Sequence, residues 1–253
     1  MEELYHIGFK KEHNARYALL PGDPGRVEAI ARRFERGEPF ARNREYTAYL
    51  CDCLGQQVIV MSTGMGGPSA AIAVEELHRT GVRNFLRVGT CGGMALDVKS
   101  GDIVIASAAI RMEGTSKEYV PVEFPAVAHI DITNALSAAA DSLGLSRGKH
   151  VGIVHCKDSF YGQHEPARMP AGRELADKWD AWLKAGCLAS EMESAALFIV
   201  AQVLGAKAGC VLNVVWNQER QARGLDDGPR PSHDNAIDTA VEAVKILIRT
   251  ENY

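Results

Sequence analysis

The chain has 253 residues, of which 46% are hydrophobic and 24% charged, and its 28 basic and 32 acidic residues give a formal net charge of −4. This length suffices for one large domain with a buried core, and the slightly acidic balance does not favour a nucleic-acid-binding surface. The first residues, MEELYHIGFKKEHN, lack the apolar segment of a secretory signal, and no apolar run approaches the ~20 residues of a membrane span. We therefore expect a cytoplasmic protein that binds neither nucleic acid nor membrane.

Strand and helix patterns alternate along residues 1–253, with no linker or internal repeat. YALLPGDPGR predicts a strand, a turn and a helix over about Val27–Phe34, and YTAYLCDCLGQQVIVMSTG predicts a hairpin that turns near Leu54 and Gly55. Further strands are predicted in NFLRVGTCGG, GDIVIASAAIRM, GKHVGIVHCKD and AGCVLNVVW, and helices in GPSAAIAVEELHRTG, ITNALSAAADSLG, EMESAALFIVAQVLGA and NAIDTAVEAVKILIRT. The alternation predicts a single α/β domain over residues 1–253, with a central mixed or mainly parallel β-sheet flanked by helices.

The cysteines are scattered and form no C-x-x-C pair; they are Cys51, Cys53, Cys91, Cys156, Cys187 and Cys210. The spacing of the first two, in CDC, is poor for a zinc site. We expect free thiols, several of them buried, as is usual in a reducing compartment.

Three arginines occur in segments that suit an anion. In PGDPGR, Gly22 lets the backbone approach a ligand and Arg26 lies in the first turn of a predicted helix. RVGTCGG places Arg87 and Thr90 at the end of another strand, and NREYT adds Arg44. Each segment alone fits an ordinary strand end or turn, but three arginines together would form a strong inorganic phosphate site. The dinucleotide fingerprint and the P-loop are absent, so NAD and ATP are not expected.

Two further segments carry unusual side chains. SEMESAAL places Glu191 and Glu193 on either side of Met192 near the start of a predicted helix. Carboxylates can accept hydrogen bonds from the vicinal hydroxyls of ribose, but acidic residues are also favoured at a helix N-terminus by its dipole. KDSFYGQHEPARMP, residues 157–170, combines cationic, aromatic and amide side chains, which suits a planar polar heterocycle, although a solvated loop with a structural aromatic is the alternative.

Taken together, the motifs of this sequence identify a protein family more specifically than any one of them does alone. YHIGF, PGDPGRV, NREYT, STGMGGPSAAIAVEEL, RVGTCGG, GDIVIASAAIRMEGTSKEY, FYGQHEP and SEMESAAL occur in this order. From about residue 5 to its end the chain thereby resembles the nucleoside phosphorylases that form hexamers or trimers, most of all their uridine-cleaving members. The resemblance implies reversible phosphorolysis of uridine, and of 2′-deoxyuridine, to uracil and ribose 1-phosphate, with phosphate as co-substrate and no metal or organic cofactor. It also implies a homo-oligomer, at least a dimer and, as a trimer of dimers, a hexamer.

The resemblance further implies roles for single residues. Phosphate would be bound by Gly22, Arg26, Arg87 and Thr90, with Arg44 donated by a neighbouring subunit, and Cys91 and Gly92 would also belong to the substrate-binding site. Ribose would be held by Met192 and Glu193, with Glu191 assisting and His6 of the neighbour at the 5′-hydroxyl. Phe160 would stack on the base and Gln163 would bond its amide edge. The catalytic residues are expected to be Arg87, Glu193, Lys157 and His164.

The chain departs from the family at the base. Purine-cleaving members carry an aspartate after the last core strand, whereas VVWNQER contains none before Glu219, so a pyrimidine fits better. The usual Gln-x-Arg is also missing, because Gln163 is followed by His164 and the next arginine is Arg168. Lys157, His164 and Arg168 are therefore the candidates to contact the base. A nucleosidase or purine nucleoside phosphorylase of the same fold, and a non-catalytic nucleoside sensor, remain as alternatives.

Overall fold

The strands of the computed structural model, which describes residues 4–9, 12–228 and 232–251, form one mixed sheet. They are β1 (Tyr17–Pro21), β2 (Arg36–Asn43), β3 (Tyr46–Cys53), β4 (Gln56–Met61), β5 (Asn84–Gly93), β6 (Ile103–Met112), β7 (Ala126–Val127), β8 (Lys149–Lys157), β9 (Ala189–Glu191) and β10 (Lys207–Asn217). Their order is β10-β6-β8-β9-β5-β1-β4-β3-β2, with β7 beside β6. Because β10 also pairs with β5, strands β5, β9, β8, β6 and β10 close on themselves, and β1 to β4 continue as an open sheet.

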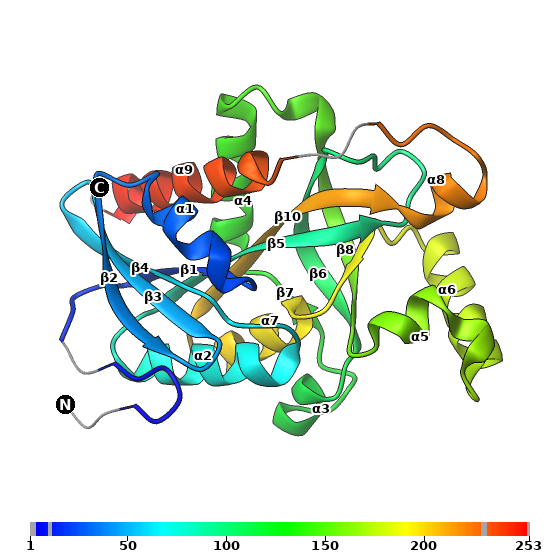
Figure 1. Cartoon of the computed structure of the whole chain (residues 1–253), viewed down its shortest axis with the longest axis horizontal. Helices are drawn as coiled ribbons and strands as arrows, with labels where there is room; N and C mark the ends of the chain where they lie inside the picture. Colours follow the sequence, from blue (N-terminus) through cyan, green and yellow to red (C-terminus); the bar gives the residue numbers. More distant parts are fainter. Residues whose placement is uncertain (1–3, 10–11, 229–231, 252–253) are drawn as a thin grey trace.

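Helices cover both faces of this sheet (Figure 1). They are α1 (Val27–Ala31), α2 (Gly67–Arg79), α3 (Thr115–Tyr119), α4 (Ile130–Ser142), α5 (Phe160–His164), α6 (Gly172–Lys184), α7 (Ser194–Val203), α8 (Gln218–Ala222) and α9 (Asp234–Glu251), with 3-10 turns η1 (Pro24–Arg26), η2 (Ser146–Gly148) and η3 (Pro166–Arg168). Leu136 of α4 and Val241 of α9 belong to one buried apolar cluster, and Val74 of α2 and Phe198 of α7 to the other. The core therefore lies in two layers, one on each side of the sheet.

The predicted α/β domain with a central mixed sheet is confirmed, and so are most of its elements. Strands β3 and β4 form the predicted hairpin, and its turn residues Leu54 and Gly55 have φ of 48° and 78°. Two left-handed residues in a two-residue loop match the right-handed twist of the flanking strands. The helix predicted from Val27 to Phe34 is shorter, because α1 ends at Ala31.

Several elements were not predicted, among them β9, β2 and α6. The segment expected to begin a helix at Glu191 first forms β9, which pairs with β5 and β8, and α7 starts only at Ser194. Strand β2 lies at the sheet edge, is largely exposed and contains Pro39. Its sequence does not show the alternation of apolar and polar residues by which a strand is predicted. Helix α6 did have a signal in its sequence, because its apolar residues recur at intervals of three and four; they are Leu175, Trp179 and Trp182.

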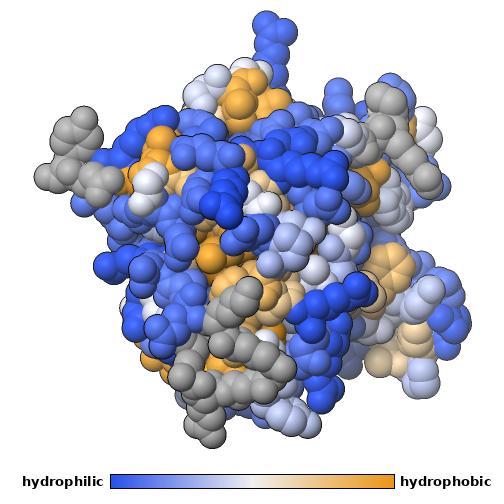
Figure 2. Space-filling view, turned by 60° about the vertical axis from the view of Figure 1, so that its left-hand side comes forward, coloured by the Kyte–Doolittle hydropathy of each residue, from blue (hydrophilic) through white to orange (hydrophobic). Residues whose placement is uncertain are grey.

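The cysteines are buried free thiols, as predicted. Within the described ranges, no three His, Cys, Asp or Glu side chains form a group that could hold a metal ion. No helix in that part of the chain is long and apolar enough to cross a membrane. Some large hydrophobic side chains are exposed, among them Met65 (84%) and Tyr5 (72%), and Figure 2 shows a face on which hydrophobic patches alternate with hydrophilic side chains.

Candidate active site

A cavity of about 450 Å³ opens where β1, β5, β8, β9 and β10 end. Of the residues singled out in the sequence, it is lined by Gly22, Arg26, Arg87, Thr90, Cys91, Gly92, Lys157, Phe160, Gln163, His164, Glu191, Met192 and Glu193. Strand β9 runs antiparallel to β5, yet both contribute to this cavity because they pair directly, with Gly92 opposite Ser190. The fold therefore brings PGDPGR, RVGTCGG, SEMESAAL and part of KDSFYGQHEPARMP to one place, but not NREYT.

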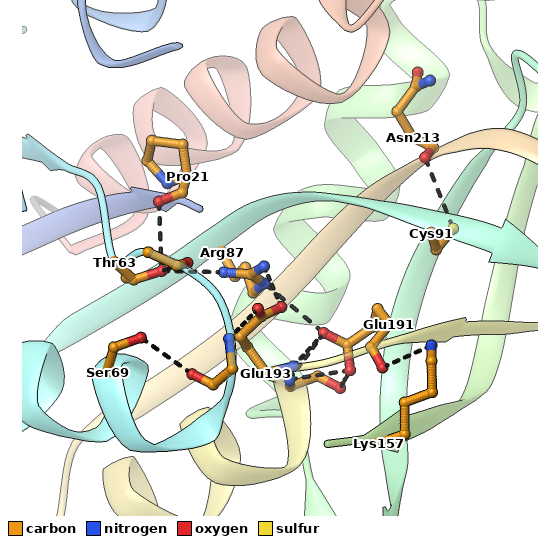
Figure 3. A network of polar contacts seen from close by, with 12 residues as sticks. Pro21, Thr63, Ser69, Arg87, Cys91, Lys157, Glu191, Glu193 and Asn213 are labelled. Atoms are coloured by element: carbon orange, nitrogen blue, oxygen red, sulfur yellow. Dashed lines mark hydrogen bonds and ion pairs between the residues drawn. The ribbon is translucent and has the colours of Figure 1, made fainter. Parts of the chain in front are cut away.

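Arg87 and Glu193 both line the cavity and form a buried ion pair (Figure 3). Arg87 is only 5% exposed, and its guanidinium donates to the Glu193 carboxylate and, at 3.4 Å, to the Thr63 hydroxyl. Its Nε lies 3.8 Å from a Glu191 oxygen. The other oxygen of Glu193 accepts from the backbone N–H of Gly66 at 2.6 Å. This pair places a cation beside a carboxylate, and both side chains are buried.

Burial and charge act in opposite directions on this pair. Burial by itself lowers the pKa of Arg87, but the carboxylates of Glu193 and Glu191 outweigh it and the pKa is raised, so the guanidinium stays charged. Burial raises the pKa of Glu193, and the charge of Arg87 opposes that rise. Glu193 thus depends on Arg87 to remain ionised.

Arg26 provides a second cation near Arg87. Burial is the main cause that lowers the pKa of Arg26; Asp23 opposes it, and the like charge of Arg87 adds to it. Gly22 lies in the turn that precedes Arg26, where a larger residue would be crowded. A Cβ at this position would lie 3.1 Å from the Gly64 carbonyl oxygen and 3.6 Å from Arg87 Nη2. Two neighbouring guanidinium groups and an accessible backbone are suited to bind a dianion.

Glu191 fits the structural alternative rather than direct ribose binding. Its carboxylate accepts from the backbone N–H of Glu193 at 2.8 Å, from that of Ser194 at 3.0 Å and from the Ser194 hydroxyl. These groups belong to the first turn of α7, whose N–H groups have no partner within the helix. Glu191 lines the cavity but is engaged in this turn, where it positions the peptide that carries Glu193.

Lys157 and Gln163 meet at the opposite end of the cavity, around a serine that the sequence analysis did not single out. Lys157, the last residue of β8, is 6% exposed and donates to Ser190 Oγ at 2.7 Å and to the Glu191 carbonyl oxygen at 3.5 Å. Ser190 Oγ also lies 2.6 Å from Gln163 Oε1. Burial lowers the pKa of Lys157, and the Glu191 carboxylate opposes this. Ser190 is the first residue of SEMESAAL, so the motif contained it, but no role was assigned to it.

Aromatic rings surround His164 on this side of the cavity. Its ring centroid lies 4.3 Å from that of Phe160 and 5.5 Å from that of Trp216. Burial lowers the pKa of His164, and the charge of Lys157 lowers it further, so the imidazole is neutral near pH 7. Trp216 and Met65 also line the cavity and were not predicted. An aromatic residue near the end of the last core strand was the available signal for Trp216.

A second, more apolar cavity of about 250 Å³ adjoins the first, and Lys157 and Gln163 line both. His155 lies in its wall, stacked on Trp182 with centroids 4.3 Å apart. His155 Nδ1 is 3.1 Å from Ser190 Oγ, whereas Nε2 is buried without a hydrogen-bond partner. Burial lowers the pKa of His155 to about 3, so its ring is neutral.

Arg168 does not line the substrate cavity. Its Nε forms an ion pair with Glu165 at 2.5 Å, and its guanidinium lies over the Tyr161 ring at 5.4 Å from the centroid. The side chain is more than half exposed. This placement supports a clamp on the loop rather than the expected contact with the base.

His6 and Arg44 also lie outside the cavity of their own chain, and close to each other. Asn43 donates to the His6 carbonyl oxygen at 2.9 Å, and the His6 ring lies 2.6 Å from Glu76. The Arg44 guanidinium is stacked over the Tyr5 ring, 5.4 Å from its centroid. The two residues thus lie near each other and apart from the cavity, and their expected role at a neighbouring subunit's site stays a prediction.

Comparison with known proteins agrees with this geometry. A sequence model of the phosphorylase superfamily matches residues 16–250. The chain belongs to this superfamily. It is 51% identical over 248 residues to a uridine phosphorylase of Treponema pallidum, which covers 98% of this chain and 95% of the relative. It is also 43% identical over 248 residues to a uridine phosphorylase of Thermococcus kodakarensis, an alignment that covers 96% of this chain and 86% of the relative.

Family membership alone does not settle which base is cleaved. The chain is 40% identical over 238 residues to a guanosine phosphorylase of Halorubrum lacusprofundi, covering 91% of this chain and 93% of the relative. Superfamily relatives of similar identity therefore carry names that differ in the base. The identity of the base therefore has to be argued from the residues around Lys157 in the cavity.

Proposed function

We propose that the chain catalyses the reversible phosphorolysis of uridine and 2′-deoxyuridine, a pentosyl transfer that forms uracil and ribose or deoxyribose 1-phosphate. The observation that carries this proposal is a single cavity with paired cations and a buried glutamate at one end and a lysine and a glutamine at the other. The similarity to the Treponema pallidum uridine phosphorylase supports it. The proposed reaction needs no cofactor, since inorganic phosphate is the co-substrate.

A pyrimidine is favoured because the base end lacks a free acid. The acidic residues that line the cavity are Asp23, Glu191 and Glu193. Asp23 is paired with Arg26, Glu191 with the start of α7, and Glu193 with Arg87. Asn217, at the end of β10, is also unavailable: it caps α8 and donates to two backbone carbonyl oxygens. Protonation of a purine ring nitrogen therefore has no evident donor of this type among the described residues.

The chemistry follows from where the charges lie. Phosphate bound at Arg26 and Arg87 attacks C1′ of the nucleoside; the C1′–N1 bond breaks and a C1′–O bond forms, through an oxocarbenium-like transition state. Glu193 accepts hydrogen bonds from the ribose hydroxyls. The electron pair leaves with uracil, and Lys157 and Gln163 donate to the negative charge that develops on it. Proton uptake then gives neutral uracil.

The first prediction is that uridine is cleaved only when phosphate is present. Base release is measured with and without phosphate for uridine, and for guanosine and inosine as purine comparisons. Equal rates in phosphate-free buffer would identify a nucleosidase. Faster cleavage of either purine nucleoside would identify a purine nucleoside phosphorylase, and binding without cleavage a sensor.

We also propose that the active assembly is a homo-oligomer, at least a dimer and by the family resemblance a hexamer, in which Arg44 and His6 complete a neighbour's site. Both residues lie outside the cavity of their own chain. Exposed apolar residues such as Met65, which lies at the cavity rim, and Tyr5 would be covered in such an assembly.

The second prediction tests this sharing. Arg44→Ala and Arg87→Ala proteins are each expected to be nearly inactive, whereas a mixture that has exchanged subunits regains activity. In a mixed dimer, the Arg44→Ala subunit keeps its own Arg87 and receives Arg44 from its partner. Random exchange therefore restores roughly a quarter of the wild-type rate, because half of the dimers carry one intact site. Recovery no greater than the sum of the separate proteins would mean that both arginines serve their own chain.

A further inference from the structure

The second cavity, of about 250 Å³, lies beside helix α6 and has no role in the proposed reaction. Helix α6 carries an apolar stripe of Leu175, Trp179 and Trp182, and all three side chains line this cavity. They are only half-buried, and none of them belongs to the two buried apolar clusters of the described residues. An amphipathic helix normally packs such a stripe against the core. Here the stripe instead forms the wall of a cavity.

Aromatic rings from two elements meet in this wall. His155 of β8 is stacked on Trp182 of α6 with ring centroids 4.3 Å apart, and it meets Trp179 edge-on at 6.0 Å. The Trp179 N–H donates to Glu219 of α8 at 2.8 Å, so the polar edge of that ring is already engaged. Met112 adds further apolar surface. Such walls suit a flat aromatic ligand, because aromatic rings prefer stacked or edge-to-face contact with one another.

His155 supplies the polar atom that distinguishes this cavity. The residue is 3% exposed and its Nδ1 lies 3.1 Å from Ser190 Oγ, whereas Nε2 has no hydrogen-bond partner among the described residues. The other side chains of the lining with charged or hydrogen-bonding groups have partners within the protein; they are Lys157, Asp158, Ser159, Gln163, Trp179 and Gln218. A buried polar group without a hydrogen bond costs free energy, and such groups are rare. His155 Nε2 is therefore the point at which a ligand would be anchored.

The chemistry of this anchor favours a hydroxyl group. Burial lowers the pKa of His155 to about 3, so the ring is neutral and one of its nitrogens carries the proton. When Nδ1 carries it, Nε2 offers a lone pair, and in the other tautomer Nε2 offers an N–H. A hydroxyl can pair with either form, because it both donates and accepts.

The size and polarity of the cavity limit the ligand further. A cavity of about 150 Å³ with apolar walls is large enough to bind benzene. The cavity beside α6 is larger and therefore admits a ring that carries a substituent. A charged molecule would lose its hydration against these walls, and Lys157 and Asp158 are already engaged within the protein. These limits describe a neutral aromatic alcohol.

We propose that the cavity between β8 and α6 is a second binding site, which takes a neutral phenol-like molecule with its hydroxyl bonded to His155 Nε2. Lys157 and Gln163 line both cavities, so an occupant would contact two side chains that also line the substrate cavity. The inference goes beyond the proposed function and does not depend on it, because binding is measured without turnover.

The first test compares phenol with toluene, which has a similar shape but no hydroxyl, in NMR titrations of the whole chain. The wild-type protein is expected to bind phenol with a Kd of about 1 mM or tighter, the scale of a very small ligand. In His155→Phe, which keeps an aromatic ring, the ratio of phenol affinity to toluene affinity should fall about tenfold, because the hydroxyl is then buried without a partner. The ratio cancels the difference in hydrophobicity between the two probes. An unchanged ratio overturns the anchor, and failure of the wild type to bind either probe means that the cavity holds water only.

The second test locates the bound probe. Leu175→Trp fills the cavity and should abolish the binding of both probes, whereas Ala181→Trp, at an exposed position of α6 outside the cavity, should leave it unchanged. Phenol that binds Leu175→Trp as tightly as the wild type, and that uracil displaces, would lie in the substrate cavity and would refute the second site. Circular dichroism shows whether each variant is folded, and His155→Phe and Leu175→Trp each decide the question if the other does not fold.

Discussion

Replacement of Arg87 by methionine is expected to lower kcat/KM for uridine by at least about 10³-fold, because one side chain serves both phosphate and Glu193. Without the guanidinium, the phosphate loses a buried cation. Glu193, whose pKa burial already raises, also loses the charge that keeps it ionised. Steady-state kinetics at saturating phosphate measures the effect. Arg32→Met is the matched control: Arg32 is an exposed arginine paired with Glu28, and its loss should leave the rate within about twofold.

The same variant predicts a pH dependence of stability with a definite sign. A carboxyl group whose pKa is raised in the folded state binds a proton more readily there than in the unfolded chain, so the folded state loses stability as pH rises through that range. The deficit in Tm of Arg87→Met relative to the wild type should therefore be larger at neutral pH than at mildly acidic pH. A deficit that does not change with pH, together with near-normal kinetics, would contradict the role assigned to the pair.

Replacement of Lys157 by methionine is expected to lower kcat by roughly 10²-fold with a smaller change in KM, because the ammonium stabilises charge that appears only as uracil departs. Burial lowers the pKa of Lys157, so its charge is lost at a lower pH than that of an ordinary lysine. The wild-type kcat should fall as pH rises through this lowered pKa, and the variant should lack that decline. Arg168→Met serves as the control, since its exposed ion pair with Glu165 lies outside the cavity, and its kcat should be unchanged. A Lys157→Met protein with normal kcat and the same alkaline decline would remove the lysine from the mechanism.

The two glutamates of SEMESAAL show what sequence could not separate. Glu191 and Glu193 are identical side chains two positions apart, and either could face a ribose. The structure distinguishes them because the N–H groups that open α7 engage Glu191, while Glu193 reaches Arg87 across a sequence separation of 106 residues. That separation is bridged by the pairing of β5 with β9, a short strand that residues 189–191 do not reveal by periodicity.

The sequence by itself determined what depends on neighbouring residues in the chain: the alternation of strands and helices, the hairpin turn, the glycine turn before Arg26, and the motif order that resembles a family. These features express local backbone preference and burial, which each segment carries with it. Only the tertiary structure decided which side chains are engaged with one another. It placed Arg168 on a loop clamp, grouped His6 with Arg44 outside the cavity, and brought Ser190 and His155 behind Gln163. Such contacts depend on strand order and closure of the sheet, and no single segment contains that information.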